Sequence, residues 1–305
     1  MSKEFHMEKK KIWFVLNIIL ISLCCFAFAM LIFTLKTQKF SNQPKDSSAS
    51  SSYTVSENTT EQKADKEKST ANWVPQAEKI ALPILMYHAV HVMDASEAAN
   101  ANLIVDPEVF EEHIKQLSEK GYYFLSPEEV HKALTENSLP NNNKKIVWLT
   151  FDDGNADFYT VAYPILKKYQ ARATNNVITD YVAKEYPASL TVEQMLEMKE
   201  NGMSFQSHTV SHPNLADSSP EKQSSELTEA KTYLDQALSQ DTIAIAYPSG
   251  KYSQLTLDKA AHSYKLGITT NEGLASSDDG LLSLKRIRIL PSTTAENLLK
   301  RIEPV

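Results

Sequence analysis

The sequence predicts an α/β fold in which a parallel β-sheet, open or closed into a barrel, occupies residues 80–305. Two observations lead to this prediction. Short runs rich in β-branched and aromatic residues alternate with longer amphipathic runs along this part of the chain. The alternation occurs seven or eight times, which is typical of a barrel. This region also contains no cysteine, so no disulfide is possible there.

The elements are expected in a regular order, each strand run being followed in most cases by a helical run. The expected strands are Pro83–Tyr87, Tyr122–Leu125, Ile146–Phe151, Ala173–Ile178, Met203–Ser207, Thr242–Tyr247, Leu266–Thr270 and Leu284–Leu290. The expected helices are Pro107–Lys120, Pro127–Thr135, Asp157–Tyr169, Val192–Asn201, Pro220–Ser239, Leu255–Tyr264 and Ala295–Ile302. In such folds the reactive side chains lie at the carboxyl ends of the strands.

The residues before Ile80 divide into three segments by composition. Residues 1–11 form a charged tail, and Ile12–Leu35 follows as about 24 residues without a charge. A helix of that length reaches about 36 Å, enough to cross a bilayer with some tilt. Residues 36–79 are polar, rich in serine and poor in aromatic residues, so they predict a disordered linker.

We interpret the apolar segment as an uncleaved transmembrane signal anchor. It is longer than the apolar core of a typical signal peptide, and no clear small-residue cleavage site follows it. Lipid modification at Cys24 or Cys25 is disfavoured because no small residue precedes either cysteine. Lysines at positions 9–11 predict a cytoplasmic N-terminus, which would place the larger part of the chain outside the cell.

Charge and glycine content exclude two classes of function. The net charge is −7 and no basic stripe is present, so we expect no nucleic-acid partner. The chain has only 7 glycines and no glycine-rich phosphate-binding motif.

Two adjacent carboxylates, Asp152 and Asp153, end the strand Ile146–Phe151 within the stretch TFDDG. Adjacent like charges at a buried strand end are unfavourable unless something neutralises them. Gly154 relaxes the backbone, so both side chains can face one site. Capping of the following helix by Asp153 or Asn155 is the alternative interpretation.

Two histidines, His208 and His212, follow the strand Met203–Ser207 in SHTVSHPNL. A spacing of four residues would place both rings on one side of a single helical turn, which Pro213 would end. Histidines in this arrangement can bind one divalent metal ion, although exposed loop histidines are the alternative.

Together the two motifs predict a metal centre with three protein ligands and one open position. One carboxylate and two imidazoles are the ligand set of many catalytic zinc sites. The metal would neutralise one aspartate, and the second would serve as a base.

Two further strand ends carry candidate residues. In AYPSGKY, which spans residues 246–252, Pro248 and Gly250 form a turn that can direct a backbone N–H into the site, unless this is an ordinary loop. In LMYHAV, His88 follows the first expected strand. A lone histidine is more often structural than catalytic, but its position at a strand end makes it a candidate.

TFDDG and SHTVSH resemble the first two motifs of the NodB-type polysaccharide deacetylases, carbohydrate esterase family 4. The resemblance extends from Ile80 to near the C-terminus and implies a distorted (β/α) barrel of seven or eight units. It implies that Asp153, His208 and His212 are the metal ligands and that Asp152 is the general base.

AYPSG resembles the family's third motif, but with Ala246 in place of the usual arginine and Ser249 in place of an aromatic residue. The resemblance implies that Tyr247, Pro248 and Ser249 face the substrate, with the Ser249 N–H stabilising the oxyanion. Arg286 or Arg288 could replace the missing arginine beside the base.

The family's fourth and fifth motifs are absent after His212. The early Tyr-His of LMYHAV instead resembles the rearranged poly-N-acetylglucosamine deacetylases, which implies that His88 is the general acid.

The expected function is therefore a metal-dependent hydrolase that removes N-acetyl groups from N-acetylglucosamine units of a cell-surface exopolysaccharide or peptidoglycan. An O-acetyl polysaccharide esterase and a non-catalytic wall-polymer-binding protein with a degenerate site are the alternatives. Zinc is the expected metal, and cobalt or nickel would also suit these ligands. We expect a monomeric catalytic domain, extracellular and attached to the cell membrane by the single N-terminal helix.

Overall fold

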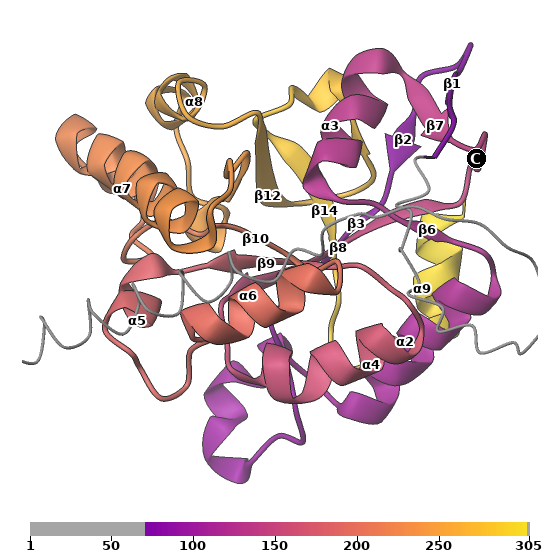
Figure 1. The fold of residues 1–305 in the computed structure, drawn as a ribbon, viewed down its shortest axis with the longest axis horizontal. Coiled ribbons are helices and arrows are strands. Elements are labelled where there is room, and N and C mark those ends of the chain that lie inside the picture. Colours follow the sequence, from indigo (N-terminus) through magenta and orange to yellow (C-terminus); the bar gives the residue numbers. More distant parts are fainter. Residues whose placement is uncertain (1–70, 304–305) are drawn as a thin grey trace, which may run out of the picture. The chain divides into compact units, whose positions relative to one another are not determined.

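The barrel is closed and consists of seven parallel strands in a computed structural model that describes residues 71–303 (Figure 1). The ring runs through β3 (Ile84–Tyr87), β14 (Leu284–Arg288), β12 (Leu266–Glu272), β11 (Ala244–Ala246), β10 (Ser204–Ser207), β9 (Thr174–Val177) and β8 (Ile146–Asp153). It closes where residues 148–151 of β8 pair with residues 84–87 of β3. The predicted α/β barrel is thus confirmed in its closed, seven-stranded form.

The expected strand near Tyr122 does not belong to the ring. Its counterpart, β6 (Tyr123–Phe124), pairs only with Ile146 and Val147 at the beginning of β8. Pairing between β8 and its ring neighbours begins at Trp148, so β6 extends the sheet on the outside. The ring therefore has seven strands, and the eight-stranded alternative is wrong.

Helices surround the strands on the outside of the barrel (Figure 1). They are α2 (Pro107–Glu119), α3 (Pro127–Glu136), α4 (Tyr163–Lys168), α5 (Thr179–Ala183), α6 (Val192–Glu200), α7 (Pro220–Leu238), α8 (Gln254–Ala260) and α9 (Ala295–Ile302). Short helical turns are η1 (Ala95–Leu103), η2 (Phe158–Ala162), η3 (Leu215–Asp217), η4 (Pro248–Gly250) and η5 (Ser277–Asp279). The helix expected over residues 157–169 is divided into the π-helical turn η2 and α4.

Three short strand pairs lie outside the ring. They are β1 (Trp73–Pro75) with β7 (Ser138–Pro140), β2 (Ala81–Leu82) with β13 (Ala275–Ser276), and β4 (Ala89–Val90) with β5 (Ile104–Val105). The linker expected to reach residue 79 therefore ends earlier, because β1 is already part of the folded structure. Trp73 packs against a buried apolar cluster, which a serine-rich linker could not do.

Alternation along β8 assigns its side chains to two cores. Leu149 and Phe151 point outward and join the cluster formed with the surrounding helices. Trp148 points inward, joins the residues inside the barrel, and donates a hydrogen bond from Nε1 to Thr174 Oγ1 at 2.7 Å. Asp152 follows Trp148 at a spacing of four residues, so it belongs to the inward-facing set at the carboxyl end.

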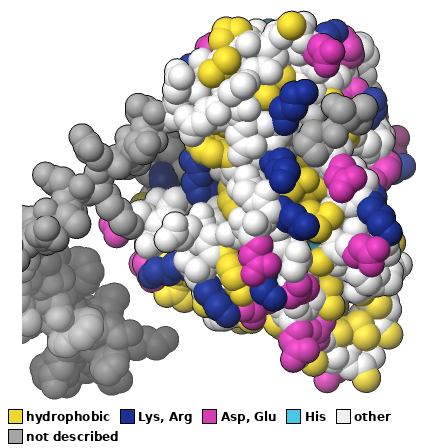
Figure 2. Space-filling view, turned by 90° about the vertical axis from the view of Figure 1, so that its right-hand side faces the viewer, with side chains coloured by type: hydrophobic (Ala, Val, Ile, Leu, Met, Phe, Trp, Pro, Cys, Tyr) yellow, Lys and Arg dark blue, Asp and Glu magenta, His cyan; other side chains and the backbone are white. Residues whose placement is uncertain are grey.

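Between residues 71 and 303, no helix is long and apolar enough to cross a membrane. The expected anchor, Ile12–Leu35, lies outside the described residues. On the face shown in Figure 2, Lys and Arg side chains are interspersed with Asp and Glu.

Candidate active site and metal centre

A cavity of about 530 Å³ opens at the carboxyl ends of four adjacent barrel strands. His88 follows β3, Asp153 ends β8, Ile178 follows β9 and His212 follows β10, and all four line the cavity. The fold thus brings together side chains that are more than 120 residues apart in sequence. The expectation that the candidate residues meet at the strand ends is confirmed for His88, Asp153 and His212.

Asp153, His208 and His212 each offer one ligand atom, and these atoms all lie within 4.8 Å of one another. His208 Nε2 is 3.5 Å and His212 Nε2 is 3.8 Å from Asp153 Oδ1. Donors bound tetrahedrally to one zinc ion would be about 3.4 Å apart, so the two distances to Asp153 are already close to those of a zinc site. His208 Nδ1 donates to the Ala246 carbonyl oxygen at 2.7 Å, which leaves Nε2 with its lone pair toward the site.

The electrostatics of this group favour a positive charge between its members. Burial lowers the pKa of His208, but hydrogen bonding to Asp153 and the charge of Asp152 outweigh burial, and the pKa is raised. A buried imidazole that attracts a proton against its desolvation cost lies in a negative potential. The donor chemistry and geometry therefore fit a divalent cation.

Unusual backbone conformations at the strand ends assemble the donor set. Asp153 has φ +82°, and in the loop after β10 Thr209 has φ +68° and His212 has φ +57°. Positive φ is unfavourable for residues other than glycine, and it is concentrated at functional sites. At Asp153 it turns the chain so that both aspartates serve one site.

The single helical turn expected between His208 and His212 is absent, and this expectation was wrong. The segment is a bend with two local hydrogen bonds. The Thr209 N–H donates to Ser207 Oγ at 3.2 Å, and the His212 N–H donates to Thr209 Oγ1 at 3.1 Å. These local side-chain acceptors compete with helical hydrogen bonding. The two rings still come together, with centroids 4.8 Å apart.

Asp152 is buried and paired with Arg286 of β14. Nη1 of Arg286 donates to Oδ1 at 2.9 Å and Nη2 donates to Oδ2 at 2.7 Å, a bidentate contact. Arg286 Nε also donates to the Thr269 carbonyl oxygen at 2.7 Å, which fixes the guanidinium plane. Of the two arginines considered as replacements for the missing motif arginine, the structure selects Arg286.

Asn176 of β9 is a second partner of Asp152 that sequence reasoning missed. Its Nδ2 donates to Asp152 Oδ1 at 2.8 Å. Burial alone would raise the pKa of Asp152, but Arg286 and His208 outweigh burial and hold the pKa well below its usual range. Two consecutive asparagines within the apolar run ATNNVI were the available signal, since buried polar side chains need a partner.

His88 lies at the cavity wall, next to the charges of the site. Burial lowers the pKa of His88, whereas Asp152 and Asp153 oppose the shift without cancelling it. Burial therefore favours the neutral imidazole, which would have to take up a proton before acting as an acid.

The end of β11 contacts the site through its backbone. The Ala246 carbonyl oxygen contacts His208, and Ser249 has φ +53° in the turn η4. Tyr247 does not line the cavity: its ring packs in an apolar cluster with Tyr264 and its hydroxyl donates to the Leu282 carbonyl oxygen at 2.9 Å. Its expected substrate role is wrong, because alternation points this side chain away from the site. Pro248 is buried, and the oxyanion role of the Ser249 N–H stays a prediction.

One wall of the cavity contains a histidine between two carboxylates. His91 Nδ1 is 2.7 Å from Asp157 Oδ2, and its Nε2 is 3.1 Å from Glu97 Oε1. Asp157 Oδ2 also accepts the Val90 N–H at 2.8 Å. These contacts connect η1 to the loop after β8. On another side Tyr181 lines the cavity, with its ring 5.0 Å from that of Tyr186.

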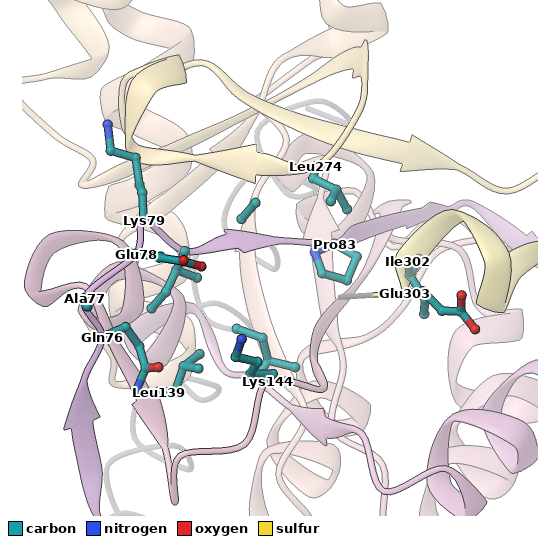
Figure 3. Close-up of a pocket in the computed structure, with 13 residues that line it drawn as sticks. Gln76, Ala77, Glu78, Lys79, Pro83, Leu139, Lys144, Leu274, Ile302 and Glu303 are labelled. Atoms are coloured by element: carbon teal, nitrogen blue, oxygen red, sulfur yellow. The ribbon is translucent and has the colours of Figure 1, made fainter. Parts of the chain in front are cut away.

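A second cavity, of about 480 Å³, lies at the opposite, amino ends of the strands. Figure 3 shows Glu78 and Lys79 from the segment before β2 on one side of it, and Ile302 and Glu303 from the end of α9 on the other. It contains no histidine, and Lys79 is already paired with Asp278. This cavity therefore lacks the chemistry of the first.

Comparison with known proteins agrees with this geometry. A family model described as polysaccharide deacetylase matches residues 140–269. YxkH of Bacillus subtilis, named among the polysaccharide deacetylases, is 39% identical over 227 residues, which cover 74% of this chain and 77% of YxkH. A poly-β-1,6-N-acetyl-D-glucosamine N-deacetylase of Staphylococcus aureus is 30% identical over 214 residues, covering 66% of this chain and 72% of the relative.

Two solved structures extend the comparison. The Streptococcus pyogenes deacetylase PplD, in complex with acetate, has 59% sequence identity and a TM-score of 0.72, covering 74% of this chain and 100% of that one. A polysaccharide deacetylase from Bacillus cereus has 29% identity and a TM-score of 0.66, covering 74% of this chain and 70% of that one. With the barrel and the site in place, these matches confirm the resemblance seen in the motifs: the chain belongs to the polysaccharide deacetylase family.

Proposed function

We propose that the chain is a metal-dependent hydrolase that removes N-acetyl groups from N-acetylglucosamine units of a cell-surface polysaccharide. One observation carries the proposal: the donor set Asp153, His208 and His212 lies next to the carboxylate of Asp152, which Arg286 orients, and Asp153 and His212 line the cavity. The S. aureus relative, named as an N-deacetylase of poly-N-acetylglucosamine, supports this substrate class. The acetate bound to the S. pyogenes relative is what hydrolysis of an acetyl group would release.

Asp153, His208 and His212 would hold the metal ion, zinc being favoured and cobalt or nickel also suitable. Such an ion, when bound, lowers the pKa of a coordinated water and polarises the acetyl carbonyl group. Every remaining task falls to the protein's own groups.

Asp152 is suited to accept the proton of the attacking water. Its Oδ1 accepts two hydrogen bonds, from Arg286 Nη1 and Asn176 Nδ2, whereas Oδ2 accepts one, from Arg286 Nη2. Oδ2 therefore keeps the freer lone pair and is the basic oxygen. The bidentate contact with Arg286 fixes the orientation of the carboxylate.

Hydrolysis forms a bond between the water oxygen and the acetyl carbon and breaks the carbon–nitrogen bond. The leaving amine nitrogen needs a proton, and His88 is the candidate donor because it faces the cavity. The Ser249 N–H is the candidate second donor to the oxyanion. The polymer would lie along the cavity past Tyr181, whose exposed ring suits the C–H face of a sugar.

The proposal is tested by measuring acetate release from N-acetylglucosamine oligomers of both β-1,4 and β-1,6 linkage and from peptidoglycan. We expect release from at least one of them, loss of release with a chelator, and recovery when zinc is added back. Full release in the presence of the chelator would remove the metal from the mechanism. Absence of acetate from all three substrates would contradict the assigned reaction.

We further propose that Ile12–Leu35 anchors the chain in the cell membrane, with a monomeric catalytic domain outside the cell. Support comes from the length and apolarity of that segment and from the lysines before it. An extracellular domain on a polar linker would reach a polymer at the cell surface.

A further inference from the structure

We propose that Glu226 of α7 is a positioning residue that holds the bend Thr209–His212 so that His212 faces Asp153 and His208. The inference rests on the proposed metal-binding role of those three residues. Glu226 is 1% exposed, although it lies on a surface helix. A carboxylate is not buried in this way without several donors.

The carboxylate of Glu226 accepts contacts from four donors, two on each oxygen. Oε2 accepts the backbone N–H groups of Val210 at 2.8 Å and Ser211 at 2.9 Å. Oε1 accepts Ser211 Oγ at 2.6 Å and Lys222 Nζ at 2.6 Å. Three of these four contacts belong to the bend between the two histidines, and only one belongs to the helix itself.

The bend needs an external acceptor because its own conformation is unfavourable. Its first and last residues, Thr209 and His212, both have positive φ, and the two N–H groups between them point the same way. Successive N–H groups that converge on one point form an anion-binding concavity. Glu226 supplies the anion, so the bend keeps its shape because of a side chain from α7.

The other side of the bend is held by α5 through backbone contacts. Thr179 N–H donates to the Thr209 carbonyl oxygen at 3.2 Å, and Asp180 N–H donates to the Val210 carbonyl oxygen at 3.0 Å. Glu226 and α5 thus bind different backbone groups of the bend. Glu226 accepts hydrogen bonds from its N–H groups, and α5 donates hydrogen bonds to its carbonyl groups.

The positions of the two histidines depend to different degrees on the hydrogen bonds between Glu226 and the bend. His208 directly follows β10, and its ring is fixed by the Ala246 carbonyl oxygen. His212 lies at the far end of the bend, and its N–H bonds only to Thr209 Oγ1 within the same bend. Loss of Glu226 should therefore displace His212 and leave His208 in place.

The experiment compares the full-length wild-type chain with Glu226→Ala, Glu226→Gln and the control Lys222→Ala. Lys222→Ala removes the ion pair of Glu226 but leaves its three contacts with the bend. Two quantities are measured: zinc affinity, by competition with a chromophoric chelator, and hydrogen exchange of the Val210 and Ser211 amides in the metal-free protein.

We expect Glu226→Ala to weaken zinc binding about 10- to 100-fold, the range seen when groups that orient metal ligands are removed. Exchange at Val210 and Ser211 should accelerate in the same variant. Glu226→Gln should show a smaller loss, because its amide retains one acceptor oxygen. Lys222→Ala should bind zinc within about twofold of the wild type.

Wild-type zinc affinity and exchange in Glu226→Ala would overturn the inference, and so would an equal loss of zinc affinity in Lys222→Ala. If Glu226→Ala does not fold, Glu226→Gln decides, and wild-type behaviour there overturns it. A wild-type chain that binds no zinc would contradict the proposed function instead. In that case amide exchange in the metal-free protein still tests the grip of Glu226 on the bend.

Discussion

Two adjacent aspartates at the end of β8 have different surroundings, and the difference assigns their roles. Asp152 is buried and bound in bidentate fashion by Arg286, so it cannot also turn toward the histidines. Asp153, turned by its positive φ, faces His208 and His212. In the proposed mechanism, the same residue type is therefore the candidate base in one position and the candidate metal ligand in the next.

Asp152→Asn and Asp153→Asn should separate these roles. Asp152→Asn removes the proton acceptor, so turnover should fall about a hundredfold or more while zinc affinity stays near that of the wild type. Asp153→Asn weakens a ligand, so zinc affinity and turnover should fall together. Zinc titration and acetate release on both variants make the test. Equal zinc affinities in the two variants would show that the assignment of ligand and base is wrong.

At the level of elements, the wall of the cavity formed by η1 depends on one ionisable contact. His91 lies between Asp157 and Glu97, and Glu97 also caps η1 by accepting the Asp94 N–H at 2.8 Å. Burial lowers the pKa of His91, but its hydrogen bonds to the two carboxylates outweigh burial and raise the pKa. Protonation of His91 therefore strengthens the attachment of η1.

The raised pKa of His91 predicts a pH-dependent contribution to stability. The pKa of histidine in an unfolded chain is about 6.5. Because the pKa is higher in the folded state, the contribution is fully present below the unfolded pKa and is lost as pH rises through the folded pKa.

His91→Gln should accordingly lower the melting temperature more at pH 5.5 than at pH 8.5. Thermal unfolding of both proteins at the two pH values measures this difference. The same decrease at both pH values would mean that the charge of His91 does not contribute to stability.

At the level of the whole molecule, closure of the barrel brings Arg286 to Asp152. β8 and β14 both pair with β3, so Asp152 and Arg286 meet across one intervening strand although 134 residues separate them. In an open sheet with β3 at one edge and β8 at the other, this contact could not form. The predicted transmembrane anchor and linker would then place the barrel at the outer surface of the membrane.

Deletion of residues 12–35 should release the protein from the membrane fraction, because no other apolar segment of this length occurs in the sequence. Deletion of residues 41–64, an equal length of the expected linker, is the control and should leave the protein membrane-bound. Sedimentation of cell membranes followed by immunodetection measures both. Retention of the first variant in the membrane would contradict the anchor.

The order of strands and helices could be predicted from the sequence because each element has a characteristic local spacing of apolar residues. Every strand of the ring overlaps a strand predicted from apolar spacing, and all seven predicted helical runs contain a helix. Periodicity does not report on short pairings such as β1 with β7, whose partners are far apart in the chain. It also could not distinguish seven ring members from eight, because β6 has the composition of a strand but pairs only with the beginning of β8.

The sequence by itself determined which candidate residues stand at which strand ends: two carboxylates at the end of β8, two histidines after β10 and one histidine after β3. These residue types are visible without a fold, because each belongs to a short motif. Only the tertiary structure decided which arginine orients Asp152, that Asn176 shares that task, that Tyr247 faces away and that Glu226 accepts hydrogen bonds from Val210 and Ser211. Those contacts join strands and helices across the barrel, and their geometry depends on strand order and side-chain direction, which local sequence does not encode.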